Sequence, residues 1–244
     1  ERKKKSKDLT RSQSSGVLGK KSLSSRMRKQ PKKPVGKAKT TLNDKLLFQC
    51  IEYLNRPECM STQGIFRVSA SHGEIRQLKE QFEEGHSISW ETREKYGEKN
   101  GVYVIAGLLI DTLLGMEDPL IPFDAYEGLM SAEPVPSEEP RLRAIRSIIN
   151  SVQPVFRSAL AKICHFLVDV AGTEGNKMTV NNLGIVFGPV LMRGRNETPQ
   201  SMMDDSPGII RITCSLIDNY EFFFLGARPI LGLYDSKIQT MQDN

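Results

Sequence analysis

One arginine stands out because of the residues that precede it. Arg67 follows a bulky apolar pair, Ile65 and Phe66, in the segment STQGIFRVSASHGEIRQLKEQF. The apolar pair is expected to sink into a core, and Gly64 before it frees the backbone to turn. Arg67 is therefore expected on a short rigid loop. A guanidinium held in this way can reach toward a binding partner, or it can be a surface group that meets only water.

The residues behind this loop have the pattern of a helix start. Ser71 lies three residues ahead of Glu74, which is the spacing of a capping box, and residues 74–82 have a helical pattern. We expect this cap to hold the loop on the side opposite the apolar pair.

The common catalytic and metal-binding motifs are absent. The sequence contains no G-x-x-x-x-G-K-[ST], no G-x-S-x-G and no H-E-x-x-H, so it does not resemble a nucleotide hydrolase, an esterase or a zinc protease. The four cysteines show no C-x-x-C spacing, and the three histidines do not pair with them at ligand spacing. We expect free thiols in a reduced, intracellular setting, no metal site and no cofactor.

The net charge of +5 hides a division of the chain. Residues 1–40 hold 15 Lys or Arg and two acidic residues, whereas the remainder holds 19 basic and 27 acidic residues. The first segment has almost no large apolar residues, so it is expected to be a flexible basic arm. The acidic remainder is not expected to bind nucleic acid. The arm could be merely solvated, could bind an anionic membrane or another acidic surface, or could be a nuclear-localisation tract.

Apolar residues recur with helical spacing almost everywhere from Thr41 onward, and no convincing alternating run indicates a strand. Residues 102–114 are apolar nearly all round, which predicts a central helix. The longest apolar run, residues 102–110, is far shorter than the ~20 residues of a membrane span. Loops are expected at residues 91–101, 118–122, 194–200 and 205–208. The sequence thus predicts an all-α domain over residues 41–226 and a loosely attached extension over residues 227–244.

Two further stretches have distinctive turns. LLGMEDPLIPFDAYE, residues 113–127, ends a buried helix and turns on two prolines into a new one. NKMTVNNLGIVFGPVLMR, residues 176–193, begins a short apolar helix for which Thr179 is the expected N-cap. Phe187, Gly188 and Pro189 are expected to break that helix.

In this order, GIFR, EDPLIPF and NKMTxxNLxIVFGPxL resemble the Rho GTPase-activating (RhoGAP) domain family over residues 41–225. The resemblance implies a RhoGAP-like helical bundle, in agreement with the periodicity. It also implies that the domain binds a GTP-bound Rho-family small GTPase and stimulates its GTP hydrolysis. Arg67 would be the family's arginine finger, so the chain would not be a stand-alone enzyme but would contribute a catalytic arginine to the partner's active site.

The chemistry of such a finger fits the residues around Arg67. Negative charge develops around the transferred phosphoryl group, and a planar, permanently charged guanidinium from a partner stabilises it. The group must arrive already positioned. The resemblance implies that the finger loop is supported by four residues of this segment: Gly64, Ile65, Phe66 and Ser69. It also implies that Asn182 and Pro189 of the third motif face the partner.

The chain departs from the family pattern at positions that usually help. The family's lysine and arginine in the helix after VYVIAGLL are Ile110 and Leu114 here, and the asparagine of its FGPN motif is Val190. The usual LPEP is replaced by MEDP, residues 116–119. Either Ile110 and Leu114 are core residues, or they form with Val190 an exposed apolar patch at the partner-binding surface.

These departures leave three functional hypotheses. The first is a GTPase activator that acts through Arg67. The second is a catalytically weak binding module of the same fold that holds a GTPase or another protein. The third is an adaptor whose function rests on the basic arm. For all three we expect a cytoplasmic protein, peripheral at a membrane if the arm binds anionic lipid.

Overall fold

The computed structural model describes residues 44–88 and 95–231, and every regular element within them is a helix. This confirms the all-α prediction. The elements are α1 (Asp44–Leu54), α2 (Pro57–Met60), α3 (His72–Glu83), α5 (Glu98–Leu114), α6 (Phe123–Ala132), α7 (Glu138–Ser151), α8 (Pro154–Gly172), α9 (Val180–Leu191), α10 (Pro199–Asp218) and the π-helical turn η1 (Glu221–Leu225). The predicted basic arm and residues 232–244 of the predicted extension lie outside the described residues.

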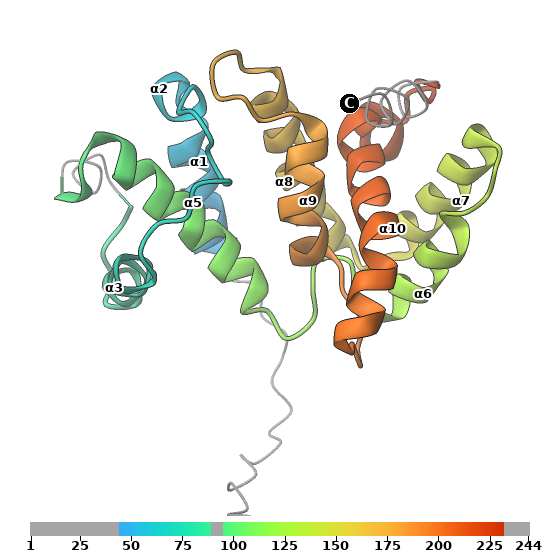
Figure 1. Cartoon of the computed structure of the whole chain (residues 1–244), viewed down its shortest axis with the longest axis horizontal. Helices are drawn as coiled ribbons and strands as arrows, with labels where there is room; N and C mark the ends of the chain where they lie inside the picture. Colours follow the sequence, from blue (N-terminus) through green and yellow to red (C-terminus); the bar gives the residue numbers. More distant parts are fainter. Residues whose placement is uncertain (1–43, 89–94, 232–244) are drawn as a thin grey trace, which may run out of the picture. The chain divides into compact units, whose positions relative to one another are not determined.

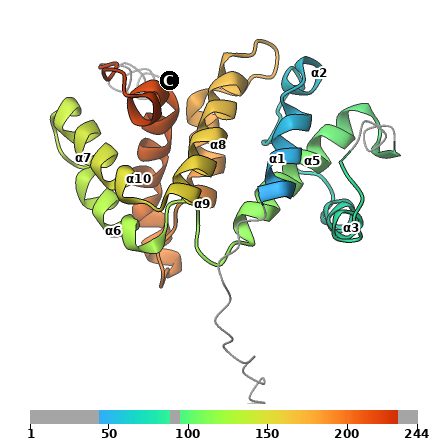
Figure 2. The same ribbon diagram turned by 180° about the vertical axis from the view of Figure 1, so that it is seen from behind.

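The helices pack around α8 and α9. α9 lies between α5 and α10 and in front of α8 in Figure 1, and it contacts all three. α1 and α3 pack on α5, whereas α6 lies against α10 and α7 against α6. Figure 2 shows the same arrangement from behind, with α8 nearer to the viewer than α9.

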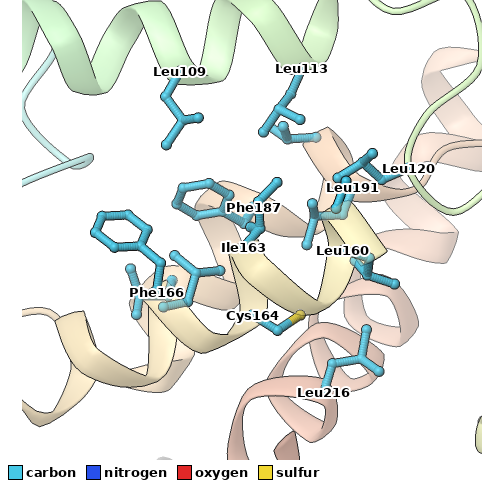
Figure 3. Close-up of a cluster of buried hydrophobic side chains, with 14 of the residues drawn as sticks. Leu109, Leu113, Leu120, Leu160, Ile163, Cys164, Phe166, Phe187, Leu191 and Leu216 are labelled. Atoms are coloured by element: carbon cyan, nitrogen blue, oxygen red, sulfur yellow. The ribbon is translucent and has the colours of Figure 1, made fainter. Parts of the chain in front are cut away.

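The core lies between these central helices. In Figure 3, Leu160, Ile163 and Phe166 of α8 lie among apolar side chains from α5, α9 and α10. All three are almost completely buried. The partners labelled in Figure 3 include Leu109, Leu113, Phe187, Leu191 and Leu216. The apolar stripes read from the sequence are therefore the faces that pack together, because burial of apolar area is the main favourable term in folding.

The close approach of α9 to α10 depends on two glycines, four residues apart. A Cβ at Gly184 would stand 2.6 Å from Cys214 Sγ, and one at Gly188 would stand 2.8 Å from Ile209 Cγ2. No side chain larger than hydrogen fits at either position unless Cys214, Ile209 or α10 itself shifts. Gly188 belongs to the Phe-Gly-Pro sequence that we expected to break the helix.

Two predicted helix breaks are wrong. α9 continues through Pro189 to Leu191, and α10 runs through Pro207, where a loop was expected. Pro189 has no backbone N–H, so α9 loses one hydrogen bond near its C-terminal end, yet the helix continues to Leu191. Pro207 lies on the exposed side of α10. Its segment is held in the helix by the Tyr126 hydroxyl, which donates to Asp205 Oδ2 at 2.8 Å.

The last described residues pack back on the domain. The backbone N–H of Ile230 donates to Oδ1 of the buried Asn219 at 2.6 Å. The extension is therefore tied to the end of α10 as far as it is described. Within the described residues, no helix is both long enough and apolar enough to span a membrane.

Candidate functional site

The loop that carries Arg67 is a tight turn with two residues in the left-handed region. Gly64 has φ 74° and Phe66 has φ 70°. The backbone N–H groups of Arg67 and Val68 both donate to Gly64 O at 2.9 Å. A left-handed conformation costs a non-glycine residue about 1–2 kcal/mol, so Phe66 needs compensation from its surroundings.

Packing of the Phe66 ring supplies that compensation. The ring lies edge-on to Phe187 of α9, with centroids 4.9 Å apart, and edge-on to Phe166 of α8 at 5.9 Å. The side chain of Ile65 is completely buried. Both residues are core anchors, as expected from the sequence. Because these anchors come directly before Arg67, the position of its Cα is set by the core.

A buried asparagine holds the other end of the turn. Asn176 Nδ2 donates to Met60 O at 3.0 Å and to Val170 O at 2.7 Å, and its own backbone oxygen accepts from Gly64 N at 2.7 Å. Asn176 Oδ1 accepts from the backbone N–H of Met178 at 2.7 Å. One side chain thus joins α2, the end of α8 and the approach to α9. Asn176 lies within the third sequence motif, but residue types and spacing did not predict this role.

A tyrosine from α5 adds a further contact to the loop. The Tyr103 hydroxyl donates to Gln63 O at 2.8 Å. This contact is not predictable from the sequence either, because a tyrosine in an apolar helix gives no signal of which group its hydroxyl contacts.

Arg67 itself is exposed, and its side chain lies over Gly64. Its Nη2 and Nε are 3.6 and 3.8 Å from the point where a Cβ on Gly64 would stand. Within residues 44–88 and 95–231, no carboxylate pairs with it and its side chain makes no hydrogen bond. The turn therefore presents a positive charge that these residues leave uncompensated.

The predicted capping box behind the loop is wrong. Ser71 stands at the N-cap position of α3, but its side chain makes no capping hydrogen bond. Glu74 instead accepts from Asn100 Nδ2 of α5 at 3.1 Å. A tertiary contact has taken the carboxylate that the capping box would have used. By contrast, the prediction of Thr179 as the N-cap of α9 is confirmed, since its hydroxyl accepts from Asn182 N at 3.2 Å.

A cleft of about 390 Å³ lies beside the turn, between residues 66–70, α3 and α5. Ile110 and Leu114 of α5 line it, together with Val68 and Ser69 of the loop. Ile110 is half-buried, and Leu114 is 49% exposed. These two residues are therefore neither pure core nor pure surface. They make an apolar wall next to the arginine.

Polar side chains of α3 complete this cleft. His72, Arg76 and Lys79 all line it. Lys79 Nζ lies 2.7 Å from Asp111 Oδ2, so its charge is partly used within the domain. We call the space lined by Val68, Ile110, Leu114 and these three α3 side chains the finger-side cleft.

The expected exposed patch does not include Val190. That side chain is 4% exposed and belongs to the main apolar core. The neighbouring Pro189 is exposed and Asn182 is half-buried, and Ile185 between them is 52% exposed. Asn182, Ile185 and Pro189 follow helical spacing, so they share the outward side of α9 while Val190 turns inward.

The described residues offer little support for a metal site or for a nucleophilic cysteine. Among them, no three His, Cys, Asp or Glu side chains are close enough to hold a metal ion. Burial raises the pKa of the Cys164 thiol to about 12, and burial also raises the pKa of Cys50. These thiols are protonated at neutral pH, which makes them poor nucleophiles.

The sequence and the fold both match known proteins. The model of the RhoGAP domain family matches residues 45–196. Rho GTPase-activating protein gacJJ of Dictyostelium discoideum is 29% identical, over 73% of this chain and 20% of its own length. Rho GTPase-activating protein 68F of Drosophila melanogaster is 36% identical, over 66% of this chain and 33% of its own. The chain thus spans between a fifth and a third of these relatives.

Solved structures show the same fold. The BH domain of Graf, the GTPase regulator associated with focal adhesion kinase, superposes with a TM-score of 0.66 at 23% identity, over 78% of this chain and 98% of its own. Human Rho GTPase activating protein 15 gives a TM-score of 0.65 at 24% identity, over 73% and 82% of the two chains. With the family match across more than half of its length, the chain belongs to the RhoGAP domain family.

Proposed function

We propose that this domain accelerates GTP hydrolysis by a GTP-bound Rho-family small GTPase, with Arg67 inserted into the partner's active site. The observation that carries the proposal is the exposure of Arg67 and its lack of an ion pair among the described residues. This arginine lies on a turn held by the buried Phe66 and Asn176. The family membership and the names of its relatives support the same function.

The Arg67 guanidinium can contribute positive charge and hydrogen-bond donors to the reaction. It cannot act as a base, and no metal or nucleophile is required from this chain. Its role is to place positive charge and a planar set of donors where negative charge develops during phosphoryl transfer. A turn anchored in the core lowers the entropic cost of placing it, because only the side-chain torsions remain to be ordered.

The partner would rest on two surfaces beside the arginine. One is the outward side of α9, with Asn182, Ile185 and Pro189. The other is the finger-side cleft, whose apolar wall is Ile110 and Leu114. The Phe66 ring packs on Phe187, so the finger turn lies directly against α9.

The finger-side cleft also favours a second candidate, a binding module with little catalysis. Ile110 and Leu114 can bury apolar area against a partner, but they cannot hydrogen-bond to the finger turn or to a phosphate. Such a domain would hold a GTPase firmly and accelerate its hydrolysis weakly.

A hydrolysis assay separates the two candidates. Single-turnover GTP hydrolysis is measured for Rho, Rac and related GTPases with and without the chain, and complex formation is measured in parallel with a non-hydrolysable GTP analogue. We expect acceleration for at least one Rho-family member and none for a small GTPase of another family. Binding without acceleration would instead support the binding module.

A further inference from the structure

A second cavity lies away from the finger turn, between α7, α8 and η1. Its volume is about 330 Å³. The residues that give it its chemistry are Arg146 and Asn150 of α7, Arg157 and Ser158 of α8, and Phe223 and Phe224 of η1. No carboxylate lines it. We call it the two-arginine pocket.

Both guanidiniums are held by uncharged groups. The Arg146 guanidinium lies over the ring of Phe222, 4.6 Å from its centroid. Arg157 Nη1 donates to Asn150 O at 3.2 Å. In the part of the chain that the structure describes, neither arginine pairs with a carboxylate. Two like charges at one cavity repel each other, so an anion between them is favourable.

The start of α8 adds to this positive potential. Pro154, the first residue of α8, lines the pocket, and the first turn of the helix contains no acidic residue. The N-cap residue, Gln153, makes no side-chain capping bond. The positive end of a 19-residue helix is therefore not offset by its own side chains. With the two guanidiniums, it suits a phosphate group.

Apolar side chains adjoin the pocket residues. Val155, next to Pro154, is 49% exposed, and Leu225, next to Phe224, is 67% exposed. A soluble phosphate would gain nothing from them. A lipid head group would, because its phosphate could enter the pocket while Val155 and Leu225 contact the acyl boundary of the membrane. We propose that the two-arginine pocket binds the phosphomonoester head group of an anionic lipid at a membrane surface.

This site leaves the finger turn free. Arg157 and Ser158 lie on the outward side of α8, whereas Phe166, which packs on Phe66, belongs to the inward side. Figure 2 shows α8 from the side on which it is nearer to the viewer than α9. Lipid binding and GTPase activation can therefore be lost independently, and the proposal does not rest on the proposed function.

Vesicle co-sedimentation of the full chain tests the proposal. Phosphatidylcholine vesicles carry either phosphatidic acid, which has a phosphomonoester, or phosphatidylserine at equal total charge. The variant Arg146→Gln with Arg157→Gln should bind the phosphatidic acid vesicles about 25-fold more weakly than wild type, because each lost charge near the surface costs about fivefold. Its binding to phosphatidylserine vesicles should change less.

A matched control removes two charges elsewhere. Lys95→Gln with Lys99→Gln alters two exposed lysines, one before α5 and one in its first turn, and should leave the preference for phosphatidic acid unchanged. The basic segment of residues 1–40 is present in every variant, so its attraction to anionic vesicles is common to all. Equal binding of wild type and the arginine variant to phosphatidic acid vesicles would overturn the proposal.

A site-resolved measurement locates the contact. In nuclear magnetic resonance spectra of the labelled full chain, inorganic phosphate should shift the Nε–Hε signals of Arg146 and Arg157 and the backbone amide of Val155. Shifts confined to residues 1–40 would contradict the site. If phosphate shifts these signals but phosphatidic acid vesicles bind wild type and variant alike, the pocket binds a soluble phosphate and the membrane assignment is wrong.

Discussion

The ring of Phe66 lies edge-on to the ring of Phe187, with centroids 4.9 Å apart, and this contact joins the finger turn to α9. The two residues belong to motifs that are far apart in the sequence, GIFR and IVFGP. Their contact explains why the segments occur together. One presents the arginine, and the other supplies both the wall against which the turn packs and the outward surface beside it.

Asn176 should be essential for the stability of this arrangement. Asn176→Asp keeps the shape but removes both Nδ2 donations, and it places a carboxylate in a site that is 1% exposed. Loss of these two hydrogen bonds and burial of an unpaired carboxylate should together cost at least about 3 kcal/mol of stability. Urea unfolding measures it. The exposed Asn196→Asp is the control, and equal midpoints for the two variants would count against the role of Asn176.

The close approach of α9 and α10 predicts a contrast between two glycines. Gly184→Ala would place a Cβ 2.6 Å from Cys214 Sγ, and such overpacking typically costs about 1–3 kcal/mol. Gly172→Ala, at the end of α8, meets nothing within 4 Å and should be neutral or slightly stabilising. Thermal melts of the two variants give the comparison. A Gly184→Ala protein as stable as Gly172→Ala would contradict the tight packing of α9 on α10 at this position.

Polar substitutions at Leu114 and Val190, two positions that depart from the family pattern, should differ in their effect on thermal stability. Leu114→Arg adds a charge at a side chain that is 49% exposed, so the melting temperature should barely change. Val190→Asn places an amide at a position that is 4% exposed, and we expect about 1–3 kcal/mol of destabilisation. Circular dichroism melts distinguish them. If Val190→Asn melts with wild type, the inward placement of this side chain is wrong.

The buried thiols should resist alkylation. Burial raises the pKa of Cys164 to about 12, so at pH 8 almost none of it is thiolate, and the side chain is also completely buried. Iodoacetamide should modify Cys164 only after unfolding in urea, as followed by mass spectrometry. Modification of the folded protein at the rate of the unfolded one would contradict this burial.

The sequence predicts the helices and the core anchors because both depend on local patterns. Apolar periodicity identifies the face that each helix buries, and the apolar pair before Arg67 is correctly expected in the core. Thr179 is identifiable as a cap because its partner, the N–H of Asn182, is only three residues away.

The wrong sequence predictions concern places where contacts between distant segments determine the local structure. Glu74 bonds to Asn100 rather than completing a cap, and the hydrogen bond from Tyr126 to Asp205 holds the Pro207 segment in α10. The roles of Asn176 and the inward turn of Val190 depend on neighbours that are distant in the sequence. Residue types and spacing do not reveal these neighbours.

The central claim is that Arg67 acts in the transition state, and one measurement tests it most directly. The single-turnover GTP hydrolysis rate of the best Rho-family partner is measured at saturating concentrations of wild type, Arg67→Ala and Arg67→Lys. A finger of this kind typically contributes about 10³-fold or more, so Arg67→Ala should lose nearly all stimulation while the GTP-bound complex still forms. Arg67→Lys should lose nearly as much, because an ammonium lacks the planar fork of donors. A rate with Arg67→Ala equal to that of wild type would contradict the account.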